Sequence, residues 1–233
     1  FDPEYPGRSP GPQPGTNIQQ TALVRFARVQ PSPAREIKMR LIEANSIQQI
    51  EYAPLTPSEQ VLERCAIARE KLELGDYDAG CNALRPWWNL SEWPRHHGLS
   101  TEAAAELLLT AGTLSGWLAS TRQVHGDQEW SQALLNGAIA LFEQVGERSR
   151  ASEGRIELAA CYYREGLFDL SRATLRSALQ SLSEDERELK VVALIRLASV
   201  ERHAARLHDA LNVLNEAAAI AATAGTWIQG RLH

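Results

Sequence analysis

The feature of this sequence that most restricts its fold is a pattern that recurs about every forty residues. In the stretch ACYYREGLFDLSRATLRSAL, apolar residues fall three and four positions apart on both sides of Gly166. This spacing is typical of two amphipathic helices joined by a tight turn. Counted from Gly166, Phe168 stands two residues on, Leu175 nine and Ala178 twelve. We take this hairpin as the candidate repeating unit.

The same offsets recur from two other anchor residues, Gly126 and Ala205. Leucine stands nine residues after each of them and alanine twelve. The anchors are separated by 166 − 126 = 40 and 205 − 166 = 39 residues, a period that marks arrays of helix hairpins. A fainter copy begins at Gly75, and the join from there to the next anchor is longer, 126 − 75 = 51 residues.

A single hairpin leaves an apolar face in water, and stacking several hairpins covers it. The sequence therefore predicts an all-α fold, a right-handed α-solenoid of stacked helix hairpins. Thr56 before Pro57, with Glu59 in the first turn, is a helix start signal. The predicted helices cover residues 58–73, 76–86, 101–124, 127–145, 148–165, 169–182, 185–204 and 207–223.

The repeat pattern also divides the chain. Residues 57–233 form the predicted repeat domain, with units at about 57–99, 100–146, 147–183 and 184–225 and the start of a further unit at 226–233. Residues 1–38 are a Pro/Gly-rich lead that we expect to be disordered or irregular, and 39–56 a short segment with a weak helix. Met39 is the only methionine, and if it is the true start then the lead is not native protein.

Composition excludes several classes of function. The net charge of −5 and pI near 5.7 give no general attraction to nucleic acid or to anionic membranes. No run of about 18 apolar residues exists to span a bilayer. Cys65, Cys81 and Cys161 are too few and too scattered for a disulfide framework, which favours a reducing cytoplasm.

No pattern of catalytic or cofactor-binding residues emerges. His96 and His97 are adjacent, but we expect consecutive side chains on a loop to point apart, and no further ligand follows at zinc spacing. Gly112 and Gly116 lack the lysine of a phosphate-binding loop and indicate close helix packing instead. We therefore expect no enzyme activity, no metal and no cofactor. The nearby tryptophans, Trp87, Trp88 and Trp93, are interpreted as a wedge at the long join between the first two units.

The repeat resembles the tetratricopeptide family, whose units carry a Leu-Gly/Ala pair, a tyrosine, a Gly-x-Tyr/Phe turn and an alanine in the second helix. The best unit matches with Leu158-Ala159, Tyr162, Gly166, Phe168 and Ala178. Three departures are visible. The terminal proline is missing, Glu201 stands where the first-helix tyrosine is expected, and the period is longer than usual. The long-unit variety found in bacterial signalling and regulatory proteins is the more similar one.

The resemblance implies a concave groove lined by the first helix of each hairpin. Mapped onto this sequence, the groove residues are Arg69, Ser120, Gln123, Ile156, Tyr163, Arg164, Ser199, Arg202 and His203. Arg69, Arg164 and Arg202 could form a basic strip that binds carboxylates of an acidic peptide. The alternative is that these arginines are solvated or paired with neighbours such as Glu165 and Glu201.

From these observations we expect a non-enzymatic scaffold that binds a protein or peptide segment, with no nucleic-acid or membrane partner. The alternative is a sensory module of a larger bacterial regulator, in which a ligand or partner changes the superhelix and so controls an attached domain. A small enzyme is a third possibility, which turnover lost on mutation of a single groove residue would support.

Overall fold

The computed structural model describes residues 54–122 and 127–222, and all regular structure in these ranges is helical. The helices are α1 (Pro57–Glu73), α2 (Tyr77–Leu84), α3 (Thr101–Arg122), α4 (Asp127–Val145), α5 (Arg148–Arg164), α6 (Phe168–Ser181), α7 (Arg187–His203) and α8 (Leu207–Ala222). Their bounds agree closely with the predicted ranges. The predicted lead at 1–38, most of the segment at 39–56 and the further unit at 226–233 lie outside the described residues.

Local signals explain where the helices begin and end. Thr56 caps α1, since its Oγ1 accepts from the backbone N–H of Glu59 at 3.3 Å while Glu59 Oε2 accepts from the Thr56 N–H at 2.8 Å. Three of the anchor residues stop a first helix with a positive φ: Gly75 at 75°, Gly166 at 77° and Ala205 at 59°. Glycine adopts this conformation without strain and alanine does so at some cost.

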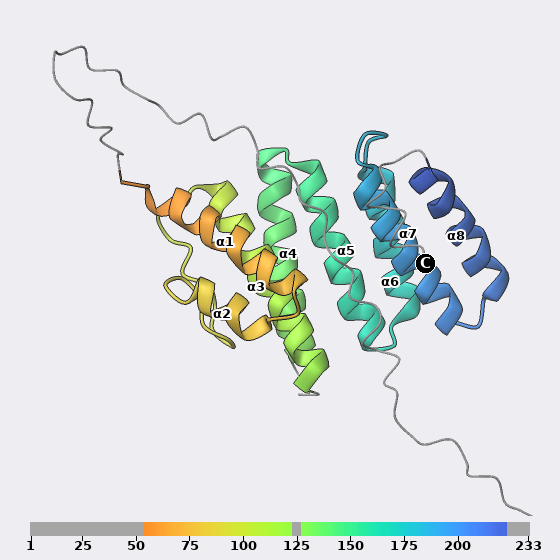
Figure 1. Cartoon of the computed structure of the whole chain (residues 1–233), viewed down its shortest axis with the longest axis horizontal. Helices are drawn as coiled ribbons and strands as arrows, with labels where there is room; N and C mark the ends of the chain where they lie inside the picture. The colour runs from red at the N-terminus through yellow and green to blue at the C-terminus, as the bar shows by residue number, and fades with distance from the viewer. Residues whose placement is uncertain (1–53, 123–126, 223–233) are drawn as a thin grey trace, which may run out of the picture.

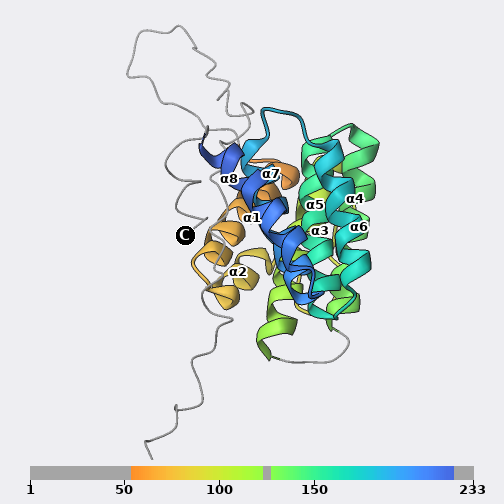
Figure 2. The same cartoon turned by 90° about the vertical axis from the view of Figure 1, so that its right-hand side faces the viewer.

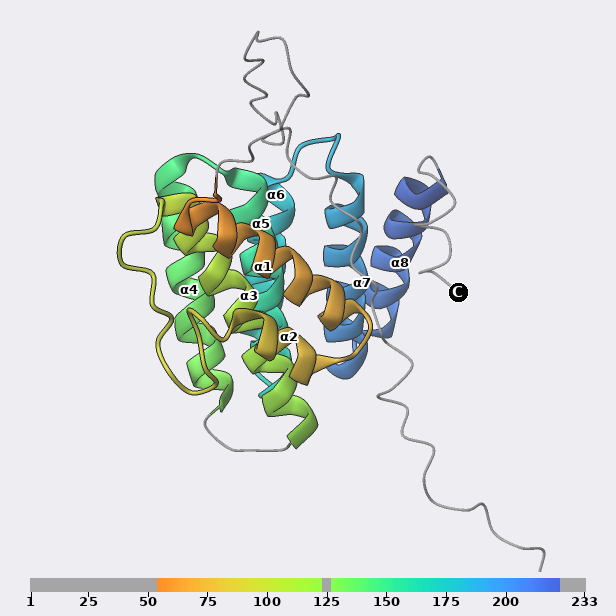
Figure 3. The same ribbon diagram turned by 60° about the vertical axis from the view of Figure 1, so that its left-hand side comes forward.

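The helices form a row of four hairpins over the described residues, α1–α2, α3–α4, α5–α6 and α7–α8 (Figures 1 and 3). Each first helix contacts the first helix of the next hairpin, and each second helix also contacts that helix. Viewed along the row, α4 and α6 lie on one side of α3 and α5 (Figure 2). The hairpins therefore stack side by side as a helical repeat and do not surround a common centre.

Small residues bring the two helices of each hairpin together. The position five residues after each anchor is buried in every hairpin and is occupied by Gly80, Ser131, Ser171 and Ala210. Ser131 Oγ donates to the carbonyl of Gly112 at 2.7 Å, and Ser171 Oγ donates to that of Ala159 at 2.7 Å. The repeat thus places a small side chain where one helix meets the backbone of its partner.

The close packing predicted for Gly112 and Gly116 is confirmed. A Cβ on Gly112 would lie 2.9 Å from Leu135 Cγ, and one on Gly116 would lie 2.8 Å from Ser131 Oγ. Both distances are shorter than the contacts that carbon atoms tolerate. Helix α4 therefore approaches α3 as closely as it does only because these positions carry no side chain.

The long join between the first two hairpins holds the tryptophans. Trp88 is fully buried in the core of the first hairpins, and its Nε1 donates to the Glu92 carbonyl at 3.0 Å. Trp93 instead lies edge-on against Trp130 of α4, with ring centroids 5.8 Å apart. The wedge interpretation is confirmed for Trp88, which packs into the core between the first two units. The join between these two units is the longest in the repeat.

The prediction that the two histidines of this join point apart is wrong, because the rings of His96 and His97 stack with centroids 4.9 Å apart. His96 Nδ1 lies 2.9 Å from the Pro94 carbonyl, which holds the ring in place. Across the part of the chain that the structure describes, no three His, Cys, Asp or Glu residues gather into a metal-binding group. The same residues include no helix long and apolar enough to cross a membrane.

Candidate binding surface on the first helices

The first-helix face is the surface carried by α1, α3, α5 and α7, on which the sequence places its candidate groove residues. Arg69 lies on α1, Ser120 on α3, and the others on α5 and α7. Gln123 lies outside the described residues. Ser120 is exposed, and Ser199 is half-buried with its hydroxyl donating to the Ile195 carbonyl at 3.1 Å. These serines therefore contribute little that is specific to the face.

One candidate groove residue, Ile156, belongs to the core instead. Its side chain is 1% exposed and packs with Leu175 and Val192 between the third and fourth hairpins. Its carbonyl is also occupied, because Arg196 Nη1 donates to it at 2.7 Å. Helical spacing could not separate an inward-facing apolar residue from a groove-facing one, since both lie on the same helix within one turn of each other.

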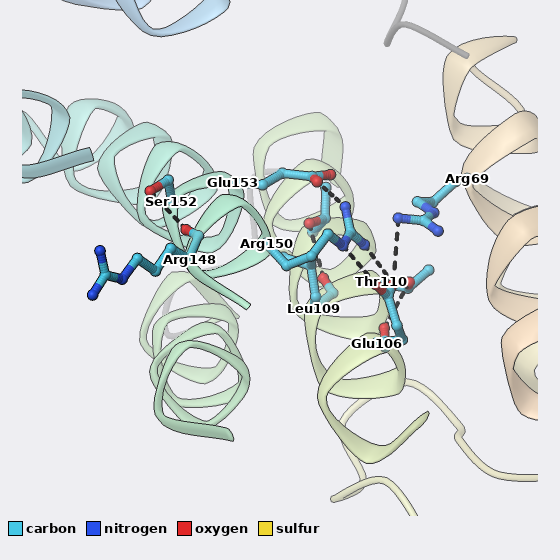
Figure 4. Close-up of polar contacts among 9 residues, drawn as sticks. Arg69, Glu106, Leu109, Thr110, Arg148, Arg150, Ser152 and Glu153 are labelled. Atoms are coloured by element: carbon cyan, nitrogen blue, oxygen red, sulfur yellow. Dashed lines mark hydrogen bonds and ion pairs between the residues drawn. The ribbon is translucent and has the colours of Figure 1, made fainter. Parts of the chain in front are cut away.

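A buried ionic cluster joins three successive first helices (Figure 4). Glu106 of α3 accepts a bidentate pair of hydrogen bonds from Arg150 of α5, with Nε to Oε1 at 2.6 Å, and lies 3.3 Å from Nη1 of Arg69 of α1. Arg150 also contacts Glu153. Sequence reasoning found Arg69 but missed Arg150 and Glu106, because their contact spans 44 residues and depends on how the hairpins stack.

The positive charges of Arg69 and Arg150 balance the negative charges of Glu106 and Glu153 within the cluster. Burial raises the pKa of Glu106, but Arg69 and Arg150 lower it by more, so the net pKa lies below the usual value. Burial lowers the pKa of Arg150 against the opposing effect of Glu106. Beside the cluster, a small pocket is lined by Arg69, Leu72, Leu109, Thr110, Thr113, Glu153 and Glu157. Arg69, the predicted groove residue in this part of the face, therefore interacts mainly with Glu106 within the protein.

Arg164 has a different environment. Its guanidinium lies over the Trp117 ring, 4.7 Å from the ring centroid, and Trp117 in turn stacks on Tyr77 with centroids 6.1 Å apart. Burial lowers the pKa of Arg164. Among the residues that the structure describes, no carboxylate lies within ion-pair distance of it, and Glu165 instead accepts from Gln132 Nε2 at 2.8 Å. Arg164 is thus a cation held by aromatic contact.

Tyr163 and His203 meet where α5 and α7 end. The Tyr163 hydroxyl lies 2.9 Å from His203 Nδ1, and their rings are nearly perpendicular with centroids 5.2 Å apart. Phe168 packs against both. Arg202 is exposed beside them, and its charge opposes the rise that burial causes in the pKa of Tyr163. These four side chains, two of them exposed, form one aromatic and basic surface that we call the α5–α7 patch.

The three arginines predicted as one strip do not all come together. Arg69 contacts Glu106 and Arg164 contacts Trp117, and these two partners are 117 − 106 = 11 residues apart on α3. That separation corresponds to about 16 Å along a helix. Arg69 and Arg164 therefore mark different parts of the face. The α5–α7 patch, beside Arg164 in sequence, holds the larger group of predicted residues.

Comparison with protein-family models finds no family that matches the chain, and comparison with curated proteins finds no match either. The geometry of the first-helix face is therefore the basis on which function is argued.

Proposed function

We propose that this protein is a non-enzymatic scaffold of the tetratricopeptide kind that binds a peptide segment of another protein along its first-helix face. The observation that carries the proposal is the α5–α7 patch, where Tyr163, Arg202 and His203 present an aromatic and basic surface next to the aromatic-stacked Arg164. Stacked hairpins offer such a face to an extended or helical segment along its whole length.

The chemistry of the patch favours a peptide with carboxylate and apolar side chains. Arg202 is exposed and can donate to a carboxylate, and the Tyr163 and Phe168 rings offer apolar area at low entropic cost. The ionic cluster at the other part of the face is balanced internally, so we assign it to holding α1, α3 and α5 in register. A bacterial cytoplasm belongs to the same proposal, supported by the three cysteines, none of which forms a disulfide.

The test uses peptides selected from a random display library on the whole chain and then titrated in solution. Arg202→Ala should weaken the selected peptide about tenfold, the scale of one hydrogen bond to a charged group. Tyr163→Ala should weaken it at least as much. Arg176→Ala is the matched control, because Arg176 is exposed on the second helix α6 and its Nη2 lies 3.9 Å from Glu201 Oε1, a group outside the patch.

Amide chemical shifts report the binding site independently of the variants. We expect the perturbed amides to lie on α5 and α7 around the patch. Equal affinity for the Arg202→Ala, Tyr163→Ala and Arg176→Ala variants, or shifts confined to the second helices, would show that the patch is not the binding site.

A further inference from the structure

The outer face of α8 differs from the same face of every earlier second helix. Nine residues after the anchors stand Leu84, Leu135, Leu175 and Leu214. The first three are fully buried, whereas Leu214 is 39% exposed. In the earlier hairpins this face is covered by the next first helix, since α2 contacts α3, α4 contacts α5 and α6 contacts α7. The face of α8 is therefore a stacking surface that no described residue covers.

The residues on that face have the spacing of a helix-pairing seam. Leu207 and Leu211 are 63% and 60% exposed, and with Leu214 and Ala218 they follow each other at intervals of four, three and four residues. This is the a/d pattern of two-stranded helix packing. The adjoining face of α8 carries Ala210, Ala217 and Ala221, which are buried. Helix α8 thus carries two packing faces, one of which is filled.

Comparison within the repeat shows what chemistry the open face takes. Leu211 stands six residues after its anchor, in the place that Arg172 occupies in the third hairpin. Arg172 reaches Glu201 of the covering helix α7. On α8 a leucine takes the place of this arginine. A helix that covers α8 therefore needs an apolar residue at the position where α7 has Glu201. The occupant is accordingly a helix with an apolar stripe.

The other end of the row cannot supply that stripe. On α1, Glu63 and Glu70 stand 12 and five residues before the anchor Gly75. The same positions on α7 are Ala193 and Val200, which pack against the preceding hairpin. The outward side of α1 therefore carries exposed carboxylates, which act as a polar cap. Head-to-tail stacking of two chains would bury these charges against leucine.

We propose that α8 pairs with α8 of a second copy of this chain in an antiparallel, two-fold symmetric interface. The seam is complementary to itself, because antiparallel a/d layers set Leu211 of one copy against Leu214 of the other, and Leu207 against Ala218. The residues beside the seam, His208 and Asn215, carry no carboxylate or ammonium group to oppose the pairing. Asp209 and Glu216 lie on the side of the helix farthest from the seam.

Sedimentation equilibrium of the whole chain over a wide concentration range tests the interface. We expect a monomer–dimer equilibrium. Leu211→Glu should weaken dimerisation at least a hundredfold, because it buries a carboxylate in an apolar layer. Asn212→Glu is the matched control on the same turn and should leave the dimer intact. Circular dichroism of both variants checks that the helices still form.

A mixing experiment identifies the antiparallel register. Leu211→Glu and Leu214→Lys should each be monomeric alone, whereas an equimolar mixture should form a heterodimer in which the two new charges face each other. A wild-type chain that stays monomeric throughout overturns the proposal. Slow hydrogen exchange of α8 in such a monomer would assign the face to another part of the same chain. A Leu211→Glu variant that dimerises as well as the wild type would place the interface elsewhere and also overturn it.

Discussion

Arg172 and Glu201 form a buried, bidentate ion pair that joins α6 to α7. Arg172 Nε donates to Glu201 Oε1 at 2.6 Å and Nη2 donates to Oε2 at 2.9 Å. Glu201 is 1% exposed, so its charge is balanced by this contact and not by water. The pair explains why glutamate stands where the repeat pattern calls for an aromatic residue: the neighbouring hairpin supplies its cation.

Removing one partner of this pair should destabilise the protein strongly. Glu201→Ala leaves the Arg172 guanidinium buried without its main partner, which costs about 3–5 kcal/mol of unfolding free energy. The double variant Arg172→Leu/Glu201→Leu removes both charges and should be close to the wild type. Urea unfolding followed by circular dichroism measures both. A double variant as unstable as the single one would show that packing, not charge balance, dominates here.

Substitution by alanine should have different effects on stability at two glycines within helices. At Gly112 the added Cβ meets Leu135 Cγ at 2.9 Å and Leu134 Cβ at 3.2 Å, so Gly112→Ala should cost about 1–3 kcal/mol. At Gly137 the nearest atom is a terminal methyl of Leu108 at 3.3 Å. There the helix propensity gained, up to about 1 kcal/mol, should offset the small displacement. Thermal unfolding of the two variants compares them, and a stable Gly112→Ala variant would mean that α3 and α4 can move apart freely.

The fold could be predicted from the sequence because its signals are local. A capping box at Thr56 and glycines in left-handed turns define helix ends within a few residues. The forty-residue period then requires one hairpin to follow another. Departures such as Glu201 were visible in the sequence, but their partners were not, because Arg172 lies 29 residues away and the pairing depends on three-dimensional stacking.

The candidate surface was predicted less well, for a related reason. Helical spacing identifies residues on one face but does not tell which neighbour each one meets. Tyr163 and Arg164 are adjacent, yet Tyr163 meets His203 of α7 and Arg164 meets Trp117 of α3. Ile156 was assigned to the surface and lies in the core. Only the arrangement of the hairpins separates these contacts.

The three thiols should differ in reactivity. Burial raises the pKa of Cys65 to about 12 and also raises that of Cys161, so both remain protonated thiols at pH 8. Cys81 is half-buried. With a thiol-specific disulfide reagent at pH 8, Cys81 should react first, and Cys65 and Cys161 only as the protein unfolds. Rapid modification of all three in the folded protein would contradict the packing around α1 and α5.

Cys65 should also make the protein sensitive to alkali. Its folded pKa lies above the usual thiol value of 9.0, so its contribution to stability is complete below about pH 9 and is lost as the pH rises toward 12. In that interval the unfolded chain releases a proton that the folded chain retains. The stability difference between wild type and Cys65→Ala should therefore shrink as the pH rises from 8 to 10 in urea titrations. A constant difference would show that the thiol is not shielded.

Glu106 in the ionic cluster should make the folded state less stable at acid pH, the opposite of the effect of Cys65. The pKa of Glu106 is lowered below the usual glutamate value of 4.5, since the two arginines outweigh the effect of burial. The carboxylate therefore stabilises the folded state fully above about pH 4.5, and this contribution is lost as the pH falls through the lower folded pKa. Glu106→Gln should cost about 3 kcal/mol at pH 7, because the buried Arg150 then loses its bidentate partner and keeps only Glu153 as a counter-charge.

The matched control is Arg69→Gln, since the Arg69 side chain is 34% exposed and meets Glu106 at the edge of the cluster. An ion pair of that kind contributes about 1 kcal/mol or less. Urea titrations at pH 7 and at pH 3 measure both variants. The penalty of Glu106→Gln should be smaller at pH 3, because below the usual glutamate pKa of 4.5 the unfolded wild-type chain binds a proton that the folded carboxylate binds less readily. A penalty that is equal at the two pH values would mean that Glu106 acts through shape and hydrogen bonding, and that its charge does not hold α1, α3 and α5 together.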